Sequence, residues 1–584
     1  MLFNRLPLFF LFYSIPSVLF LCFIIPPMQA PDEFAHFFRA EQLSAGEIIG
    51  VKQEINGRIV SGGYVDSNLF KVIGRFTYLV HDQSIKISDE VLQGAGTLSW
   101  TDSRILNLFP NTVVYPPFCY SSQVVGIWIG KFFNLSILDT YYLCRTLTAL
   151  SCVLICFLAL HWCHRGRIVM FTVLLFPMTL FLFSSCSQDA LLISLIVLII
   201  AIFSRLSEAK RQTTATEYLL ILIGMAAVLT TRPPYIGLII LFFWDSVKYQ
   251  LQPVRRSIGT TGTRNIAVIF VLSTLVGWAT LVSHLEVTMI PGASVSGQLT
   301  YLINNPTSIY YTAVNTISEH TISYVMGTIG VLGWLDTYFP MFYYITTVVI
   351  IFIALIAESI TSNTLSSRAR IIALLALLTC ILGVFAALYL RWSPVGSEMV
   401  DGVQGRYFIP LIPLLTFLVP SVSERVATKI KITLIVVTLF PLMSTVLMNI
   451  LIVERYYLSF HIPKYQSVIG DWDNDGFLEV GIKRGSQWFL DNGNGVWDEC
   501  GTFPTHDVCI ANYGSASDQP VAGDWNSDGF TEIGIARGTH WFLDNGNGIR
   551  DKCGAFPDHD VCINMGLRGF PINKSRAPFK AGKK

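Results

Sequence analysis

Three ionisable residues, Asp32, Glu33 and His36, lie just beyond the first long apolar run of the sequence, which ends at Pro26-Pro27. Ionisable groups are costly to bury at a membrane face, so such a cluster indicates a site rather than an anchor. A carboxylate placed here can act as a general base. His36, four residues after Asp32, would share its helical face. The residue types therefore favour proton transfer at the edge of a membrane.

A plainer interpretation of the same residues stays open. Pro31 suits the first turn of a helix, and Asp32 and Glu33 would then stand at its N-terminus, where the helix dipole favours negative charge. Neighbouring residues on a helix point about 100° apart, so the two carboxylates cannot both aim at one atom from equivalent positions. Spacing alone leaves a helix cap and a catalytic group as alternatives.

The elements that position these residues belong to a membrane protein. The 584 residues are 52% hydrophobic and 14% charged, and the mean hydropathy is +0.54. A soluble protein of this length would not show that balance. The net charge of +1 argues against nucleic acid as the main partner, and no RNA-binding aromatic signature occurs.

Eleven apolar runs are predicted to cross the membrane. The first, 6–27, has the basic start of a secretory signal, but Pro26-Pro27 and the lack of a small-x-small cleavage pattern favour a retained helix. Residues 218–244 form either two spans or one broken helix. The runs after the first are 141–162, 168–185, 190–204, 218–230, 235–244, 266–282, 341–357, 371–390, 407–420 and 432–452.

The basic loops give the predicted orientation. They all fall on one face, which the positive-inside rule makes cytoplasmic, so the N-terminus is inside and the long loops 28–140 and 283–340 are outside. Residues 116–133 contain Lys131 and two glycines and are predicted to form an interfacial or re-entrant helix. A true span there would invert every later loop. The basic loops are 164–167, 205–211, 248–264, 368–370 and 425–431.

The membrane part is predicted to cover residues 1–455. The region that follows it has a different composition and repeats itself at a spacing of 53 residues. GDWDNDGF at 470–477 returns as GDWNSDGF at 523–530. Repeats of this length are typical of propeller blades or stacked β units. We expect a linker at 456–467, a β module at 468–566 and a basic, flexible tail at 567–584.

Each repeat places oxygen-bearing side chains at alternate positions before a glycine, which is the spacing of a calcium loop. Neither copy has the glutamate of an EF-hand at the twelfth position, so a helix–loop–helix is excluded. An acidic turn without metal is the alternative. The candidate ligands are Asp471, Asp473, Asp475 and Glu479 in the first copy and Asp524, Asn526, Asp528 and Glu532 in the second.

The repeats also copy their cysteines. Cys500 and Cys509 return as Cys553 and Cys562, nine residues apart in each case. On the outer side of a membrane, one disulfide per repeat is the simplest pairing, and cross-repeat pairing is the alternative.

A second candidate group on the outer face is Gln404-Gly405-Arg406-Tyr407, at the start of the tenth predicted span. An arginine at this depth needs a partner, and a lipid phosphate held with the help of Gln404 and Tyr407 would supply one. Snorkelling of Arg406 to the interface is the alternative. The motif at 333–336, GWLD, ends the second long loop, and packing explains it more simply than an acceptor groove does.

Several ordered motifs between about residues 5 and 455 carry a family resemblance. The membrane part resembles a family of multi-pass prokaryotic membrane proteins known only as a domain of unknown function. Phe34 departs from that family's pattern, which usually has proline at this position. The motifs are PPMQAPDEFAHFFRAEQLSAG, VVYPPFCYSSQVVGIWIGKFFNLSILDTYYLCR, FPMTLFLFSSCSQDALLIS, RPPYIGL, GVLGWLDTYFP and DGVQGRYFIPLIPLL.

That family is similar to the GT-C glycosyltransferases, which take a sugar from a polyprenyl-phosphate carrier. These enzymes carry an acidic motif in the first outer loop, and many carry a second acidic residue between the third and fourth helices. The resemblance implies Asp32 as base, with Glu33 as its substitute and His36 beside them. It also implies a role for Asp189, which would hold a divalent metal; an N-cap for the next helix is the alternative.

The tail resembles the aspartate-rich β-propeller repeats of the FG-GAP and integrin-alpha-like kind through its GDWD/N-x-DGF-x-E-x-GI motif. That resemblance implies Ca²⁺ as a ligand. Known propellers of this kind have more blades than two repeats supply, so a small open module or completion by another molecule is expected.

Taken together, these features predict a polytopic α-helical membrane protein, GT-C-like, with about eleven transmembrane helices and a small extracytoplasmic all-β repeat module. The location implied is a prokaryotic cytoplasmic membrane. The function implied is inverting transfer of a sugar from a polyprenyl-phosphate donor to a glycan, lipid or protein acceptor. The rival is a non-catalytic protein of surface-polysaccharide assembly or transport, with an adhesive tail.

A transporter is disfavoured because its carboxylates would lie near the bilayer midplane. Asp32, Asp189 and Arg406 instead fall at the outer ends of predicted spans. If the enzyme interpretation is right, these three residues should converge on one outward cavity.

Overall fold

The computed structural model describes residues 3–564, apart from 56–57, 81–82, 102, 210–212, 245–259, 362–364, 422–426, 459–464, 495–498, 503–504, 516–517, 539 and 556–557. The chain divides into two compact units, Met1–Leu458 and Ser459–Lys584. The predicted basic tail at 567–584 and the middle of the predicted linker lie outside the described residues. So do parts of three predicted basic loops, 205–211, 248–264 and 425–431.

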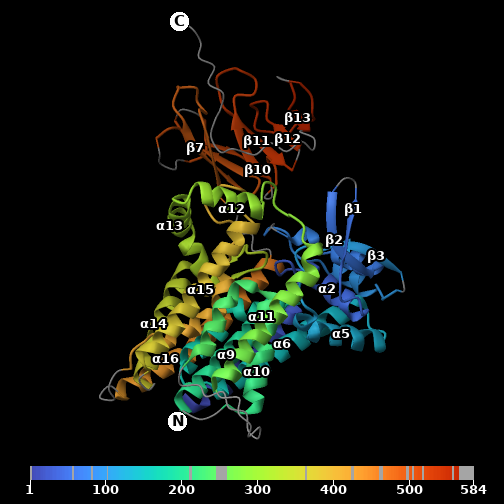
Figure 1. Cartoon of the computed structure of the whole chain (residues 1–584). Coiled ribbons are helices and arrows are strands. Elements are labelled where there is room, and N and C mark those ends of the chain that lie inside the picture. The colour runs from blue at the N-terminus through green and yellow to red at the C-terminus, as the bar shows by residue number, and fades with distance from the viewer. Residues whose placement is uncertain are drawn as a thin grey trace. The chain divides into compact units, whose positions relative to one another are not determined.

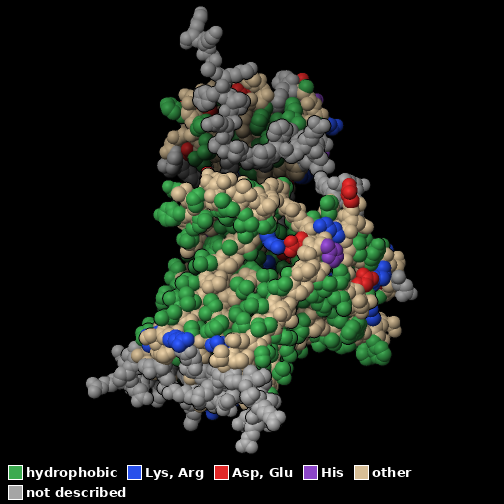
Figure 2. Space-filling model, viewed as in Figure 1, with side chains coloured by type: hydrophobic (Ala, Val, Ile, Leu, Met, Phe, Trp, Pro, Cys, Tyr) green, Lys and Arg blue, Asp and Glu red, His purple; other side chains and the backbone are tan. Residues whose placement is uncertain are grey.

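Within the described part of the first unit, seven helices are long and apolar enough to cross a membrane. Figure 2 shows hydrophobic side chains over most of the visible face of this bundle, as expected of helices that contact lipid. The seven are α1 (Leu6–Ile24), α6 (Ile137–Trp162), α9 (Gln188–Ala209), α11 (Thr260–Val282), α14 (Met341–Thr361), α15 (Ser367–Arg391) and α16 (Ala427–Tyr456) (Figure 1).

The other predicted spans form shorter helices, because proline divides them. Proline has no N–H to donate and disfavours a helical conformation in the residue before it. Pro177 begins one such helix and Pro233 another, while Pro410 and Pro413 lie inside a third. The prediction of eleven long membrane helices is therefore corrected: the described residues form seven helices of spanning length and several shorter ones. The short helices are α7 (Arg167–Leu174), α8 (Pro177–Phe183), α10 (Ala215–Thr231), η4 (Pro233–Phe243) and η6 (Gly405–Phe417).

The first long loop folds into a subdomain beside the bundle (Figure 1). Its strands form an antiparallel sheet in the order β1-β2-β3, and the aromatic residues Phe37 and Phe38 of α2 are buried in its core. The elements are α2 (Glu33–Ser44), β1 (Val51–Ile55), β2 (Arg58–Asp66), α3 (Ser67–Gly74), η2 (Thr77–Leu79), α4 (Asp89–Gly96), β3 (Arg104–Leu108), η3 (Pro117–Tyr120) and α5 (Ser121–Phe132).

Helix α5 forms most of the segment, 116–133, that was predicted to lie at the membrane interface. Its 12 residues give a length of about 18 Å, which is too short for a hydrocarbon core of about 30 Å. Lys131 near its end pairs with the buried Glu41 of α2 at 2.9 Å. The segment therefore packs in the subdomain as a helix too short to be a full span, and its place at the membrane interface stays a prediction.

The second long loop contains two helices and a small hairpin. Trp334 of the predicted packing motif stacks on Phe34 of α2, with ring centroids 6.1 Å apart. Asp336 of the same motif pairs with Arg455 of α16 at 2.9 Å, so the motif packs, as the simpler interpretation had it. The elements are η5 (Ser283–Leu285), α12 (Val295–Asn304), α13 (Ser308–Ile329), β4 (Val331–Leu332) and β5 (Thr337–Tyr338).

In the second unit each repeat forms one four-stranded antiparallel sheet, with strands paired in chain order. Equivalent strands of the two sheets lie 53 residues apart, as the repeat predicts. The first sheet contains β6 (Tyr465–Gly470), β7 (Glu479–Arg484), β8 (Gln487–Leu490) and β9 (Val508–Ile510). The second contains β10 (Gln519–Gly523), β11 (Glu532–Arg537), β12 (His540–Leu543) and β13 (Val561–Asn564).

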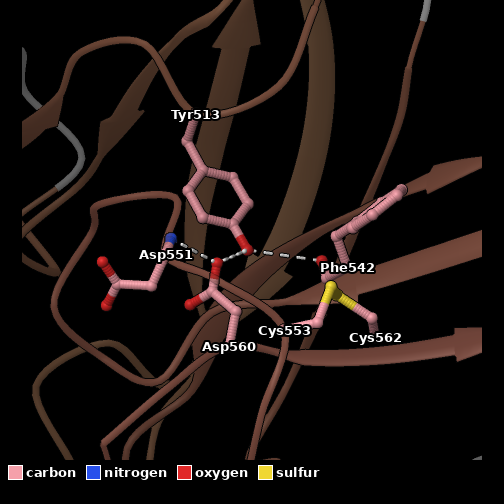
Figure 3. Close-up of a disulfide and its surroundings, with 6 residues drawn as sticks. All are labelled: Tyr513, Phe542, Asp551, Cys553, Asp560 and Cys562. Atoms are coloured by element: carbon pink, nitrogen blue, oxygen red, sulfur yellow. Dashed lines mark hydrogen bonds between the residues drawn. A yellow bond between two sulfur atoms is a disulfide. The ribbon is translucent and has the colours of Figure 1, made fainter.

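The predicted cysteine pairing is confirmed, with one disulfide in each repeat: Cys500–Cys509 and Cys553–Cys562. Beside the second disulfide, the hydroxyl of Tyr513 donates to the Asp560 carboxylate and the Phe542 carbonyl, both at 3.4 Å (Figure 3). Tyr513 follows the first sheet, and Asp560 and Phe542 belong to the second repeat. This side chain therefore ties the two repeats together.

Candidate functional site

A cavity of about 440 Å³ lies between the first-loop subdomain and the ends of α9, α10, α11, α15 and η6. It gathers six of the predicted membrane-site residues from distant parts of the chain. Its volume falls in the range usual for small-ligand sites. The six are Asp32, His36, Asp189, Gln404, Arg406 and Tyr407.

Asp32 stands at the start of α2 in a left-handed backbone conformation, with φ at +61°. Aspartate tolerates this region better than most residues, and the cost is typical of a backbone held for function. Its side chain does not cap the helix, so the capping interpretation does not account for it. One carboxylate oxygen accepts from Asn111 Nδ2 at 3.0 Å, and the half-buried side chain faces the cavity.

Glu33, predicted as a substitute base, has a different environment. It is fully buried and pairs with Arg145 of α6 through both oxygens, at 2.9 and 2.8 Å. The backbone N–H of Cys186 also donates to it at 2.9 Å. Glu33 is absent from the cavity lining. A carboxylate held in this way cannot take a proton from a substrate, so Glu33 is corrected to a structural residue.

His36 lines the cavity but does not bond to Asp32. Its Nδ1 lies 2.9 Å from the Tyr120 hydroxyl, and its ring stacks on Tyr115 at 6.1 Å between centroids. Burial lowers the pKa of His36 to about 4, although Asp32 and Asp189 act in the opposite direction. The imidazole is therefore neutral near pH 7 and suits hydrogen bonding better than acid catalysis.

Asp189 begins α9 and binds two arginines. Arg232 Nη2 lies 2.6 Å from one of its oxygens and Arg406 Nε lies 3.4 Å from the other. All three side chains are largely buried, and both guanidinium groups lie over the Tyr407 ring, at 4.2 and 5.7 Å. Two arginines facing one carboxylate leave positive charge uncompensated at this end of the cavity.

This arrangement does not fit the predicted metal at Asp189. Two guanidinium groups would repel a divalent cation from this carboxylate. Among the described residues, the groupings of His, Cys, Asp and Glu with metal-binding spacing lie in the second unit. An N-cap role does not fit Asp189 either, because its own amide donates to Ser187 Oγ at 3.1 Å while its carboxylate turns to the arginines.

The arginines retain capacity for a ligand. Arg406 is 6% exposed, and within the described structure its Nε has no hydrogen-bond partner of good geometry. The Gln404 amide oxygen is likewise buried without a partner there. Buried polar groups without partners are costly. A phosphate would satisfy the guanidinium donors through charge-assisted hydrogen bonds, whereas the Gln404 oxygen needs a donor such as a hydroxyl group. The site therefore suits an oxyanion at the arginine end and a base, Asp32, elsewhere on its wall.

The sequence-based prediction missed Arg232, Arg145 and Tyr115. Arg232 stands alone between two apolar runs in Thr231-Arg232-Pro233-Pro234-Tyr235, and a lone charge at a helix end was a signal for it. Arg145 lies inside an apolar helix, where a charge requires a buried partner. Nothing about Tyr115 in the sequence marked it as a neighbour of His36.

The predicted calcium ligands form two groups in the second unit. Ligand oxygens of Asp471, Asp473, Asp475 and Glu479 lie within 4.8 Å of one another, as do those of Asp524, Asp528 and Glu532. Asn526 lies in the second loop, where its Oδ1 accepts from the Asp528 amide at 2.8 Å. The oxygen-only donor set fits a hard cation such as Ca²⁺. Glu532 Oε1 is buried without a hydrogen-bond partner among the described residues.

Residues 17–415 match the model of a family described as "Predicted membrane protein (DUF2142)". The match covers more than half of the chain, so the chain belongs to this family. The predicted kinship with a multi-pass membrane family of unknown function is thereby confirmed. No curated protein and no solved structure matches the chain.

Proposed function

We propose that this member of the DUF2142 membrane family is a glycosyltransferase that takes a sugar from a polyprenyl-phosphate donor. The observation that supports the proposal is the single cavity that Asp32, Arg232 and Arg406 all line. A base and an oxyanion site on one cavity are what transfer from a phosphate leaving group requires. A small-ligand binding protein would need no base.

The reaction follows from these groups. Asp32 takes the proton of an acceptor hydroxyl, and the acceptor oxygen attacks the anomeric carbon of the donor sugar. The bond from that carbon to the phosphate oxygen breaks, and the phosphate leaves on the opposite face with the bonding electrons. Arg232 and Arg406 stabilise the charge that develops on it. The sugar is transferred with inversion.

The proposed orientation places this cavity outside the cytoplasm, with the N-terminus inside. In it, α10, η4, η6 and the α7–α8 pair accompany the seven long helices as short or broken spans, which gives eleven. Broken helices at membrane depth are tolerated where they line a cavity. The Arg232 break and the start of η6 at Gly405 both line this one.

The test is sugar transfer by the purified protein in lipid, with a panel of radiolabelled polyprenyl-phosphate sugars and the variants Asp32→Asn and Arg406→Ala. Loss of a general base costs about 10²–10⁴-fold, and loss of an oxyanion donor about 10²–10³-fold. Glu319→Gln changes an exposed carboxylate on α13 in the same way and should leave the rate unchanged. Full transfer by both cavity variants would show that the site is wrong.

We also propose that the aspartate-rich loops of the second unit bind Ca²⁺. The converging oxygens of the two groups and the unpartnered Glu532 Oε1 support this proposal. Bound Ca²⁺ would order the turns between β6 and β7 and between β10 and β11, and so stabilise this unit.

A further inference from the structure

Apolar side chains of α11 and α15, two helices long and apolar enough to cross a membrane, line part of the cavity. We infer that the gap between these two helices is a lateral portal through which the isoprenoid chain of a polyprenyl phosphate enters from the bilayer. This inference rests on the proposed function, because it gives the donor lipid a place at the same site. It adds where the chain lies and how it arrives.

Helix α11 forms one side of the portal. Of the seven long helices it is the least buried, so it is held mainly by its neighbours α10 and η4. Leu275, Trp278 and Ala279 of α11 line the cavity. The indole N–H of Trp278 donates to the Val114 carbonyl at 2.9 Å, which fixes this aromatic ring at the wall.

Helix α15 forms the other side, with Val384, Ala387 and Leu388 on the cavity. It packs closely on η4, since a Cβ at Gly383 would collide with the carbonyl of Pro234. By contrast, the described residues of α11 and α15 do not pack extensively on each other. The η4 side of the gap is therefore sealed, and the gap between the helices remains.

An ion pair crosses the gap at one end. Glu286, just after η5, accepts from Arg391 at the end of α15 at 2.6 Å, and both residues are exposed and line the cavity. The other α11 and α15 side chains on the cavity are apolar, whereas the largely buried Arg232 and Arg406 supply the positive charge of its lining. This order of polarity matches a lipid with a phosphate head and a hydrocarbon chain. A soluble sugar nucleotide would have no use for the apolar walls.

The experiment measures binding rather than transfer. Protein in lipid nanodiscs is mixed with a long-chain polyprenyl phosphate that carries a photoreactive group in its isoprenoid chain, and with a short, water-soluble isoprenyl phosphate. We expect cross-links to peptides of α11 and α15. Ala387→Trp should weaken long-chain binding at least tenfold and leave short-chain binding unchanged. Ala386→Trp, an exposed neighbour outside the cavity lining, should change neither.

The outcomes separate this inference from the function on which it rests. Short-chain binding also reports that the Ala387→Trp protein is folded, and cross-linking of the wild type needs no substitution. If long-chain binding depends on Arg406 but is unchanged by Ala387→Trp, with cross-links outside α11 and α15, the portal is overturned. That result would remain consistent with the phosphate site. Portal-dependent binding without any sugar transfer would support the portal and refute the transferase. No binding of either phosphate would refute both.

Discussion

Two adjacent carboxylates at the start of α2, Asp32 and Glu33, have opposite environments. Asp32 faces the cavity with one hydrogen bond from Asn111, whereas Glu33 is enclosed by Arg145 and two backbone N–H groups, those of Cys186 and Ala30. One step along the chain thus separates a carboxylate that faces the cavity from one that joins the first loop to α6.

Glu33→Gln should destabilise the protein. It leaves the buried Arg145 without its counter-charge, which typically costs about 3–5 kcal/mol. The measurement is thermal unfolding in detergent, with Asp32→Asn as the matched control, since that half-buried residue should show little change. If the Glu33→Gln protein is as stable as the wild type but does not transfer sugar, Glu33 has a catalytic role and the structural assignment is wrong.

The burial of His36 predicts a pH dependence of stability. Its pKa falls from about 6.5 in the unfolded chain to about 4 in the fold. Above pH 6.5 the residue is neutral in both states and contributes nothing. Between pH 6.5 and pH 4 only the unfolded chain binds the proton. As the pH is lowered through this range, the free energy of unfolding therefore falls by up to about 1.4 kcal/mol per pH unit. His36→Gln should flatten that part of the curve, and a wild-type slope retained in the variant would contradict the assignment.

Sequence reasoning singled out Asp32 because its position after an apolar run is a local feature, and the structure puts this residue on the cavity wall. It misjudged Glu33 because the deciding partner, Arg145, is 112 residues away. The family resemblance suggested a metal at Asp189, but its partners Arg232, between α10 and η4, and Arg406 of η6 could not be read from the sequence near it. The residues around one member of such an ion pair do not show where in the sequence its partner lies.

At the scale of elements, the contact of η6 with α13 positions Arg406. The carbonyl of Gly405 accepts from Thr328 Oγ1 at 2.8 Å, and a Cβ at Gly405 would collide with the backbone of Tyr324 and Thr328. Only glycine permits this approach, so the guanidinium next in sequence is held at a fixed depth.

Gly405→Ala should therefore move η6 away from α13 and cost about 1–3 kcal/mol, as overpacking does. Since Arg406 would shift with it, we expect polyprenyl-phosphate binding to weaken at least tenfold. Gly277→Ala on α11 is the control, because a Cβ there meets nothing within 4 Å and alanine favours a helix. Equal binding by both variants would show that this contact does not position the arginine.

Hydropathy predicted where the apolar helices lie but not their lengths. The run at 168–185 was predicted as one span, yet it divides at Pro177, and the break expected within 218–244 falls at Arg232 and Pro233. Periodicity does not report whether a proline kinks a helix or ends it, because neighbouring helices decide how the freed backbone groups are satisfied.

At the scale of the whole molecule, the chain has separate hydrophobic cores. The cores of the first unit contain no residue beyond Tyr456, and the core of the second runs from Val468 to Ile535. Composition predicted this division, because the repeats begin where the apolar runs stop. The constant spacing of the repeat also predicted the disulfides, since each cysteine pair falls within one repeat.

Separate cores predict separate unfolding, each unit responding to its own ligand. Calcium at 100 times its dissociation constant should stabilise the second unit by about 2.7 kcal/mol and leave the first unchanged, while polyprenyl phosphate should do the reverse. Calorimetry of the full chain in detergent, with Ca²⁺ and then with a chelator, would resolve two transitions. The double variant Asp471→Asn/Asp524→Asn removes one ligand from each loop and should abolish the calcium shift. A calcium shift that survives in this variant would place the ion elsewhere, and a single transition moved by both ligands would show that the units unfold as one.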